Sequence, residues 1–334
     1  MNTGEHIVML PFMAQGHIIP FLALARKIQQ HTGYTITIVN TPLNVRYLQS
    51  TISSDTPTNT NTNTIRVAEL PFCSSDHGLP PNSENTDSMP PHQFIKLMTA
   101  SQTLQPSFHC LVSTMVEQES RPLCIISDVF LGWAVDVAKS VGTSHVSFTT
   151  GGGYGTAAYF SLWLNLPHRS TDSDKFTLPG FPNSRRFHRS QLHPFLRAAD
   201  GTDPWSRFFQ KQIPLSLGSN GMLCNTVEEI EPLGLELLRK NTSLPVWAIG
   251  PLLPPSFLRS SSGSNISYSR VGKEPSIAPE RCIQWLDFHP PASVLYISFG
   301  CQNTISASQM MELAMGVEAS GKPFYLGHKA SIWV

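Results

Sequence analysis

Near its start the chain has a short apolar segment, a break and then a second apolar segment, and this pattern restricts the fold more than any other. The first segment, His6–Phe12, has the length and composition of a strand buried in a parallel sheet. Gly16 permits a tight turn, and Pro20 suits the first turn of a helix that continues to Lys27. The sequence therefore predicts a strand, a turn and a helix, with the turn at the carboxyl edge of the sheet, where open α/β folds bind ligands.

A histidine, His17, lies on this predicted turn. An imidazole can accept a proton near neutral pH, so His17 is a candidate general base. A turn histidine without a catalytic role is the alternative, and position alone does not separate the two interpretations.

The amino half of the chain goes on alternating strand-like and helix-like segments, which is typical of a parallel sheet. The further predicted strands are Tyr34–Asn40, Ile65–Leu70, Leu123–Ser127, His145–Thr149, Gly221–Asn225 and Val246–Gly250. The predicted helices are Asn44–Ser50, Phe94–Gln118, Leu131–Val141 and Val227–Arg239, the last with an acidic first turn. Leu178–Asp203 is predicted to be an irregular connection.

Two further features lie at strand-to-helix turns. Asp128 directly follows a predicted strand, where it is either a functional carboxylate or a helix cap. The glycine-rich run Gly151–Gly155 lacks the G-x-G-x-x-G spacing of a dinucleotide loop and the Lys-Ser/Thr of a P-loop. It predicts a flexible or tightly packed helix entry, which argues against a dehydrogenase.

Composition excludes several classes of protein. Lys plus Arg and Asp plus Glu both total 23, so neither a nucleic acid nor an anionic membrane is an expected partner. The six cysteines are scattered, which argues against a metal site or a disulfide framework. We expect no transmembrane segment and no signal peptide, and hence a cytoplasmic protein.

The carboxyl part predicts a second domain that begins without being completed. Pro251–Pro279 is rich in Pro, Ser and Gly and is interpreted as a linker. Ala292–Gly300 then predicts a strand, and Ser306–Ser320 a helix capped by Ser306 or Ser308. One such unit cannot bury its own faces.

Several segments, in this order, resemble the plant UDP-sugar-dependent glycosyltransferases of the GT-B type that act on small lipophilic acceptors. They are His6–Pro20, Gly78–Pro80, Ile126–Asp128, Leu178–Pro182, Cys224–Glu231, Val246–Pro251, Cys282–Asp287 and Ser293–Gly300. The resemblance implies an α/β fold with a complete amino-terminal Rossmann-like domain (1–250), a linker (251–279) and the truncated start of a UDP-sugar-binding domain (280–334).

The resemblance also implies roles for individual residues. His17 matches the family's general base, which takes the proton of an acceptor hydroxyl during inverting sugar transfer. Asp128 matches the carboxylate that orients this histidine, much as the third member of a hydrolase triad does. No metal or other cofactor is expected, because the UDP-sugar is a co-substrate.

On the donor side the match is incomplete. The loop at Gly300 would contact the diphosphate, with Thr304 as a hydroxyl donor. Cys301 stands where the family usually has Ser or Thr, and a plain packed thiol is its alternative role. The family's long donor-binding signature has no match in Gly321–Val334, where Ile332–Val334 resembles the start of the next strand and Tyr325–Ser331 looks inserted or out of frame.

Two functional hypotheses follow from this incomplete match. The first is a glycosyltransferase with His17 as base and a small lipophilic acceptor. The second is a catalytically inactive form that binds at most an acceptor or a partner protein, with weak or no affinity for UDP-sugar.

Overall fold

The computed structural model describes residues 5–54, 65–253, 277–299 and 305–327. The chain divides into two compact units, residues 1–271 and 272–334, which are considered separately below. Among the described residues, no helix is both long and apolar enough to cross a membrane.

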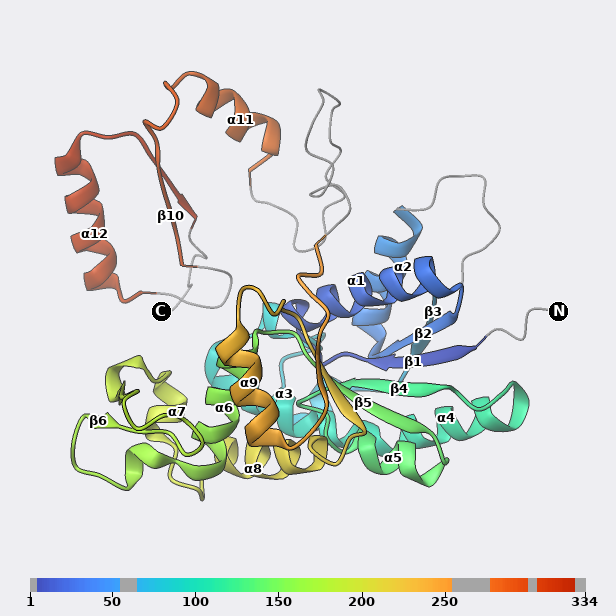
Figure 1. The fold of residues 1–334 in the computed structure, drawn as a ribbon. Helices are drawn as coiled ribbons and strands as arrows, with labels where there is room; N and C mark the ends of the chain where they lie inside the picture. Colours follow the sequence, from blue (N-terminus) through green and yellow to red (C-terminus); the bar gives the residue numbers. More distant parts are fainter. Residues whose placement is uncertain (1–4, 55–64, 254–276, 300–304, 328–334) are drawn as a thin grey trace. The chain divides into compact units, whose positions relative to one another are not determined.

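The first unit is built on a seven-stranded, all-parallel sheet (Figure 1). Its strand order is β3-β2-β1-β4-β5-β8-β9. The strands are β1 (His6–Leu10), β2 (Thr35–Asn40), β3 (Ile65–Glu69), β4 (Cys124–Asp128), β5 (Ser144–Thr149), β8 (Gly221–Cys224) and β9 (Val246–Ala248). The predicted strands are thus confirmed, with ends that differ by one or two residues.

Helices connect successive strands of this sheet, as parallel pairing requires. The α-helices are α1 (Gln15–Thr32), α2 (Pro42–Ser54), α3 (Phe94–Ser101), α4 (Gln105–Gln118), α5 (Ala134–Ser140), α6 (Gly153–Asn165), α7 (Pro194–Ala198), α8 (Pro204–Ser216) and α9 (Pro232–Thr242). Short 3-10 helices are η1 (Ser74–His77), η2 (Thr86–Ser88), η3 (Pro91–Gln93), η4 (Gln102–Leu104), η5 (Pro167–Arg169) and η6 (Arg189–Gln191).

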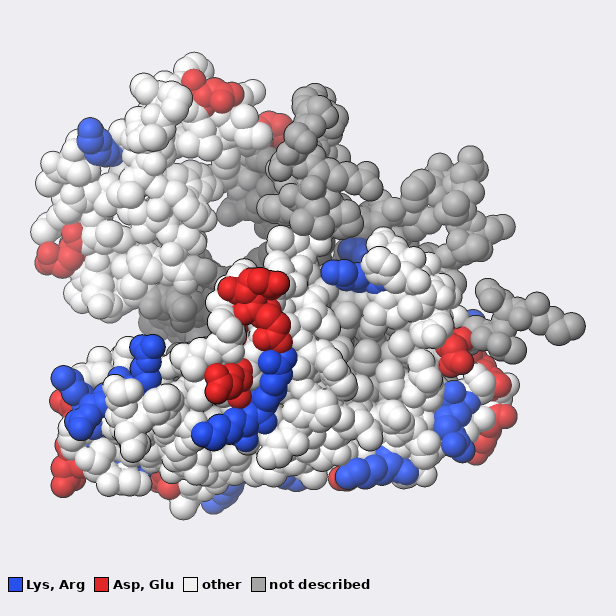
Figure 2. Space-filling view, viewed as in Figure 1, with Lys and Arg blue, Asp and Glu red and all other residues white. Residues whose placement is uncertain are grey.

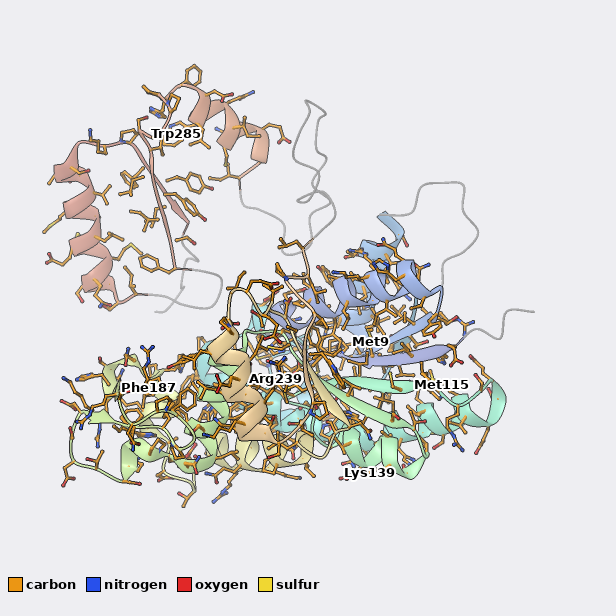
Figure 3. The ribbon with its side chains drawn as sticks, in the orientation of Figure 1. Met9, Met115, Lys139, Phe187, Arg239 and Trp285 are labelled. Carbon is orange, nitrogen blue, oxygen red and sulfur yellow. The ribbon has the colours of Figure 1, made fainter. Side chains whose placement is uncertain are left out.

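The sheet is covered on both faces, which explains the unbroken apolar run of β1. Ile7 and Met9 belong to one core cluster, which includes residues of α1 and α2. Val8 and Leu10 belong to the other, which includes residues of α3, α4, α5, α6, α8 and α9. Side chains of a strand alternate between faces, so β1 must be apolar at every position. Figure 3 shows Met9 in the layer between the sheet and α1.

The first helix differs from its prediction. It begins at Gln15, so Gly16 and His17 lie inside its first turn, not on a turn before it. Ala14 is the N-cap residue in an extended conformation, and its carbonyl oxygen accepts the N–H of Ile18. Pro20 therefore falls within the helix, one turn later than expected.

The helix after β8 also differs from its prediction. It begins at Pro232 and not at Val227, so the acidic residues expected in its first turn precede it. Glu228 forms an ion pair with Arg239, and the Glu231 carboxylate binds the backbone of α6. Glu228 is therefore occupied by the last turn of α9 and Glu231 by the N-terminus of α6, and neither lies in the first turn of α9.

The irregular connection 178–203 is confirmed in part, because it also contains short regular pieces. The two-residue strands β6 (Lys175–Phe176) and β7 (Phe187–His188) pair antiparallel, and η6 and α7 follow.

On the face shown in Figure 2, charged side chains lie in small groups of both signs, separated by uncharged surface.

In the part of the second unit that the structure describes, two strands pair in parallel, β10 (Leu295–Ser298) and β11 (Phe324–Gly327). Its helices are α11 (Pro279–Asp287) and α12 (Ala307–Ser320), and Ser306 caps α12 through a capping box with Gln309. The second strand therefore lies at β11, inside a segment interpreted from sequence as partly inserted. Residues 332–334, expected to begin that strand, lie outside the described residues.

Candidate functional site

The sheet order brings the two candidate catalytic residues together. In the sheet, β1 lies beside β4. The chain runs from β1 to β2 in one direction and from β4 to β5 in the opposite direction, so β1 and β4 form the topological switch point. His17 lies in the first turn of the helix that follows β1, and Asp128 is the last residue of β4. The two residues are 111 positions apart in sequence and meet at the carboxyl edge of adjacent strands.

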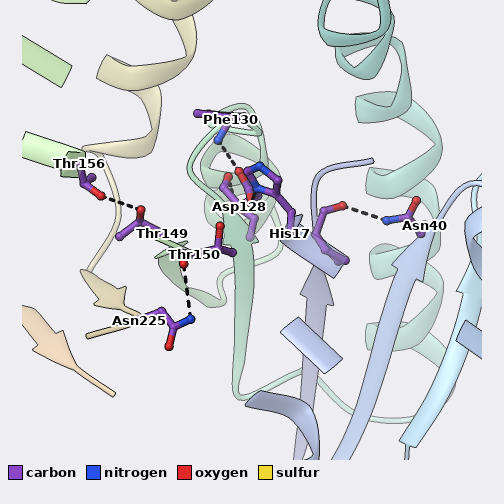
Figure 4. A network of polar contacts seen from close by, with 10 residues as sticks. His17, Asn40, Asp128, Phe130, Thr149, Thr150, Thr156 and Asn225 are labelled. Atoms are coloured by element: carbon purple, nitrogen blue, oxygen red, sulfur yellow. Dashed lines mark hydrogen bonds and ion pairs between the residues drawn. The ribbon is translucent and has the colours of Figure 1, made fainter. Parts of the chain in front are cut away.

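The His17 and Asp128 side chains form a short contact (Figure 4). The imidazole Nδ1 lies 2.5 Å from the carboxylate Oδ2. The Asp128 side chain is completely buried, whereas 21% of the His17 side chain is exposed. The other carboxylate oxygen, Oδ1, accepts the backbone N–H of Phe130 at 2.9 Å.

This arrangement fixes the protonation pattern of the imidazole. A carboxylate is an acceptor only, so Nδ1 carries the hydrogen and donates it to Asp128. Nε2 is then the nitrogen with a free lone pair, on a side chain that reaches solvent. The geometry gives a proton acceptor at Nε2, backed by a buried negative charge that stabilises the imidazolium.

Hydrogen bonds from two other segments hold the connection between β1 and α1. At the end of β2 the buried Asn40 donates from Nδ2 to the carbonyl oxygen of Pro11 at 2.9 Å (Figure 4). The backbone N–H of Thr86 donates to the carbonyl oxygen of Met13 at 3.3 Å. The loop that contains Thr86 is itself fixed to α2, where the Glu84 carboxylate accepts the N–H of Leu43. The backbone that carries His17 is thus fixed from both sides.

Aromatic rings surround the imidazole. Phe12 packs edge-on against it at 5.5 Å between ring centroids, and Phe130 lies at 5.2 Å. Phe130 in turn contacts Tyr159 and Phe209. The His17 ring therefore has a polar contact on Nδ1 and apolar contacts on its sides, which restrict its rotation.

The glycine-rich run after β5 is a tightly packed helix entry, as one of its two interpretations predicted. A Cβ on Gly152 would lie 2.3 Å from Oε2 of Glu231, and one on Gly153 would lie 2.9 Å from the backbone of Gly234. The Glu231 carboxylate accepts the N–H groups of Gly153 and Tyr154 at 3.0 and 3.4 Å. A carboxylate from another element thus occupies the N-terminus of α6, where a ligand anion would otherwise bind.

A buried polar network lies beside the carboxyl end of β4. The His145 ring contacts the hydroxyl groups of Ser127 and Ser219 at 3.0 and 2.9 Å, and Ser219 also contacts Ser147. Burial and, to a lesser extent, the charge of Lys139 lower the pKa of His145 to about 3. His145 is therefore neutral at physiological pH, and its ring links β4 to the segment before β8 through Ser127 and Ser219.

The structure brings His17 and Asp128 together, but the three candidate donor residues cannot be placed. Gly300, Cys301 and Thr304 lie outside the described residues. Sequence reasoning missed Asn40, Phe130 and Glu231, which hold the site through tertiary contacts. Asp128 is not the cap of α5, whose N-cap residue is Trp133.

Comparisons with known proteins identify the family. Residues 5–254 match the family model "Glycosyltransferase, N-terminal domain". Crocetin glucosyltransferase 3 of Crocus sativus is 50% identical over 327 residues, which cover 97% of this chain and 66% of that protein. UDP-glycosyltransferase 92A1 of Arabidopsis thaliana is 40% identical, with 98% and 63% covered.

The solved structures agree with these sequence matches. The crystal structure of Glycyrrhiza uralensis UGT73P12 complexed with glycyrrhetinic acid 3-O-monoglucuronide superimposes with a TM-score of 0.74 at 28% identity. The superposition covers 98% of this chain and 64% of the UGT73P12 chain. The fold and the matches define a GT-B-type transferase class. The chain belongs to the plant UDP-glycosyltransferase family, and it spans 66% and 63% of the length of the two relatives named above.

Proposed function

We propose that this chain carries the acceptor-binding and base-bearing part of an enzyme that transfers a sugar from a UDP-sugar to a hydroxyl group of a small lipophilic acceptor. The observation that carries the proposal is the contact between His17 and the buried Asp128 at the switch point of the sheet. The aromatic rings around His17 support an apolar acceptor, because they would contact its carbon skeleton.

The proposed reaction is a single displacement with inversion. Nε2 of His17 takes the proton of the acceptor hydroxyl as its oxygen attacks the anomeric carbon of the sugar. The new carbon–oxygen bond forms on the face opposite UDP, and the bond to the phosphate oxygen breaks with its electron pair leaving on UDP. Asp128 keeps the proton on Nδ1 and stabilises the imidazolium that forms.

For the domain organisation, we propose an acceptor-binding domain over 1–250, a connection over 251–279 and the first part of the donor-binding domain over 280–334. Within the last part, the backbone at Gly300 and the hydroxyl of Thr304 would approach the diphosphate. Cys301 would contribute only a weak donor there, since a thiol hydrogen-bonds less strongly than a hydroxyl. We expect weak UDP-sugar binding by this chain.

The test measures UDP binding by calorimetry and sugar transfer from UDP-glucose to a panel of phenols and terpenoid alcohols. We expect His17→Ala to lower kcat at least about 100-fold with an unchanged melting temperature. Asp128→Asn should also lower kcat, because an amide can donate to Nδ1 and stabilise the wrong tautomer. Transfer that survives His17→Ala would contradict the proposal. Acceptor binding without any transfer by the unaltered chain would favour the inactive binding form.

A further inference from the structure

Within the first unit, a row of aromatic side chains extends from His17. Two of its members carry polar groups, the phenol hydroxyl of Tyr159 and the indole N–H of Trp163. Tyr159 on α6 contacts Phe130 at 6.0 Å between ring centroids, and Phe130 contacts His17 at 5.2 Å. Tyr159 also packs edge-on against Phe209 at 5.2 Å and against Trp163 at 6.1 Å. The phenol of Tyr159 is thus two ring contacts away from the proposed base.

The polar atoms of Tyr159 and Trp163 are not used by the described part of the protein. Trp163 is 3% exposed, and its Nε1 is buried without a hydrogen-bond partner. The neighbouring indole lowers the pKa of Tyr159, but it forms no regular hydrogen bond. Among the described residues, the Tyr159 hydroxyl donates to no protein group.

The surroundings keep the Tyr159 hydroxyl protonated. Burial raises the pKa of Tyr159 well above its usual range, and the negative charge of Asp128 raises it further. The phenol is therefore protonated at neutral pH and can donate a hydrogen bond. The side chain is only partly buried, so the ring is not enclosed on all sides.

Unpaired donors in apolar surroundings are uncommon, because each loses its hydrogen bonds to water without replacement. We propose that Tyr159 is a specificity-determining residue, whose hydroxyl donates to a second oxygen of the acceptor, remote from the hydroxyl that reacts at His17. Trp163, whose ring packs edge-on against that of Tyr159, is a positioning residue. The preferred acceptor is a flat, conjugated molecule with a carbonyl, carboxylate or hydroxyl oxygen beyond the reacting hydroxyl.

This inference rests on the proposed function, since it places the acceptor hydroxyl at His17. The aromatic row supports a flat acceptor, because ring faces and edges at these spacings pack against a planar molecule. The Tyr159 hydroxyl then supplies orientation, so that one end of the acceptor is held while the other faces the imidazole.

The test uses a matched pair of ligands, para-hydroxyacetophenone and para-ethylphenol, which differ by one carbonyl oxygen. Calorimetric titration of the purified chain gives Kd for each without any sugar donor. We expect the unaltered chain to prefer para-hydroxyacetophenone. Tyr159→Phe should weaken that ligand about five- to tenfold and leave para-ethylphenol within about twofold, which is the range for one neutral hydrogen bond.

Two further variants complete the design. Trp163→Phe should weaken para-hydroxyacetophenone by a smaller factor, since it acts through the phenol. Tyr154→Phe, on the same helix but packed against Phe181, is the matched control and should change neither ligand. The inference is overturned when Tyr159→Phe weakens both ligands equally or neither, or when the unaltered chain does not prefer the carbonyl ligand. These outcomes are independent of the transfer assay, in which His17→Ala and Asp128→Asn test the proposed function.

Discussion

The two units of this chain are made from the same parallel strand and helix pattern, yet they bury their apolar side chains to very different extents. In the first unit, Phe148 on β5 is completely buried and packs against Phe21 of α1. In the second unit, Phe288 is 84% exposed, and Tyr296 on β10 is 67% exposed. Among the described large apolar residues of the second unit, Val317 is buried, and most of the others are exposed.

The difference shows what a parallel sheet needs. Seven strands with helices on both faces enclose two core clusters, whereas the strands and helices described in the second unit leave most of their large apolar side chains exposed. Apolar side chains of the same kinds therefore contribute to stability in the first unit, where they are buried, and much less in the second, where most are exposed. The stability of this chain therefore lies in the first unit.

The largest expected effect tests this contrast directly with one pair of substitutions. Phe148→Ala should lower the free energy of unfolding by about 3–5 kcal/mol, because it leaves a cavity in a closed core. Phe288→Ala should change it by less than about 0.5 kcal/mol, because the ring is exposed in the described structure. Urea unfolding followed by circular dichroism measures both. Equal effects would show that Phe288 is buried in solution.

A smaller effect concerns the acid sensitivity of the first unit. Burial lowers the pKa of His145 from its ordinary value of 6.5 to about 3, so the folded state favours the neutral ring. The stability that this neutral form contributes is complete above pH 6.5 and is lost as the pH falls toward 3. Between pH 6.5 and pH 5 we expect a loss of about 2 kcal/mol in urea unfolding.

The control for this pH dependence is His145→Asn, which keeps hydrogen-bonding groups near Ser127 and Ser219 but cannot be protonated. The variant should show a flatter dependence. Some slope should remain, because burial also lowers the pKa values of His6 and His168. An unchanged slope would assign the acid sensitivity to residues other than His145.

The smallest expected effect compares two helical glycines. A Cβ on Gly234 of α9 would lie 2.5 Å from the backbone nitrogen of Tyr154, whereas a Cβ on Gly316 of α12 meets nothing within 4 Å. Gly234→Ala should destabilise the first unit by about 1–2 kcal/mol, because α6 must move away. Gly316→Ala should stabilise α12 by about 1 kcal/mol through helix propensity. Hydrogen exchange of the two helices gives both values, and effects of the same sign would contradict the contrast.

Much of the fold could be predicted from the chain. The apolar runs at β1 and β4 specify strands buried on both faces, because hydrophobic periodicity is a local property. Helix starts were less accurate. α1 begins three residues earlier than the Ile18 where the second apolar segment starts, because the extended Ala14, which has no capping side chain, is its N-cap. α9 begins five residues late because Glu231 binds α6 instead.

The candidate site, like the fold, contains residues that the sequence predicted and residues that only the structure revealed. Sequence placed His17 and Asp128 on strand-to-helix connections and, through the family resemblance, paired them. It did not indicate Phe130, whose backbone N–H holds Asp128 and whose ring contacts the imidazole. Nor did it indicate that Asn40 fixes Pro11. Contacts between segments that are distant in the chain leave no periodic pattern.

By itself, the sequence determined the alternating strands and helices, the family and the identity of the two candidate catalytic side chains. These follow from local patterns of apolar and polar residues and from the order of short motifs. Only the tertiary structure decided that the His17 and Asp128 side chains meet at 2.5 Å, that Glu231 occupies the entry of α6, and that Nε1 of Trp163 is buried without a hydrogen-bond partner. The reason is physical: burial and partner choice depend on which elements the sheet order brings side by side.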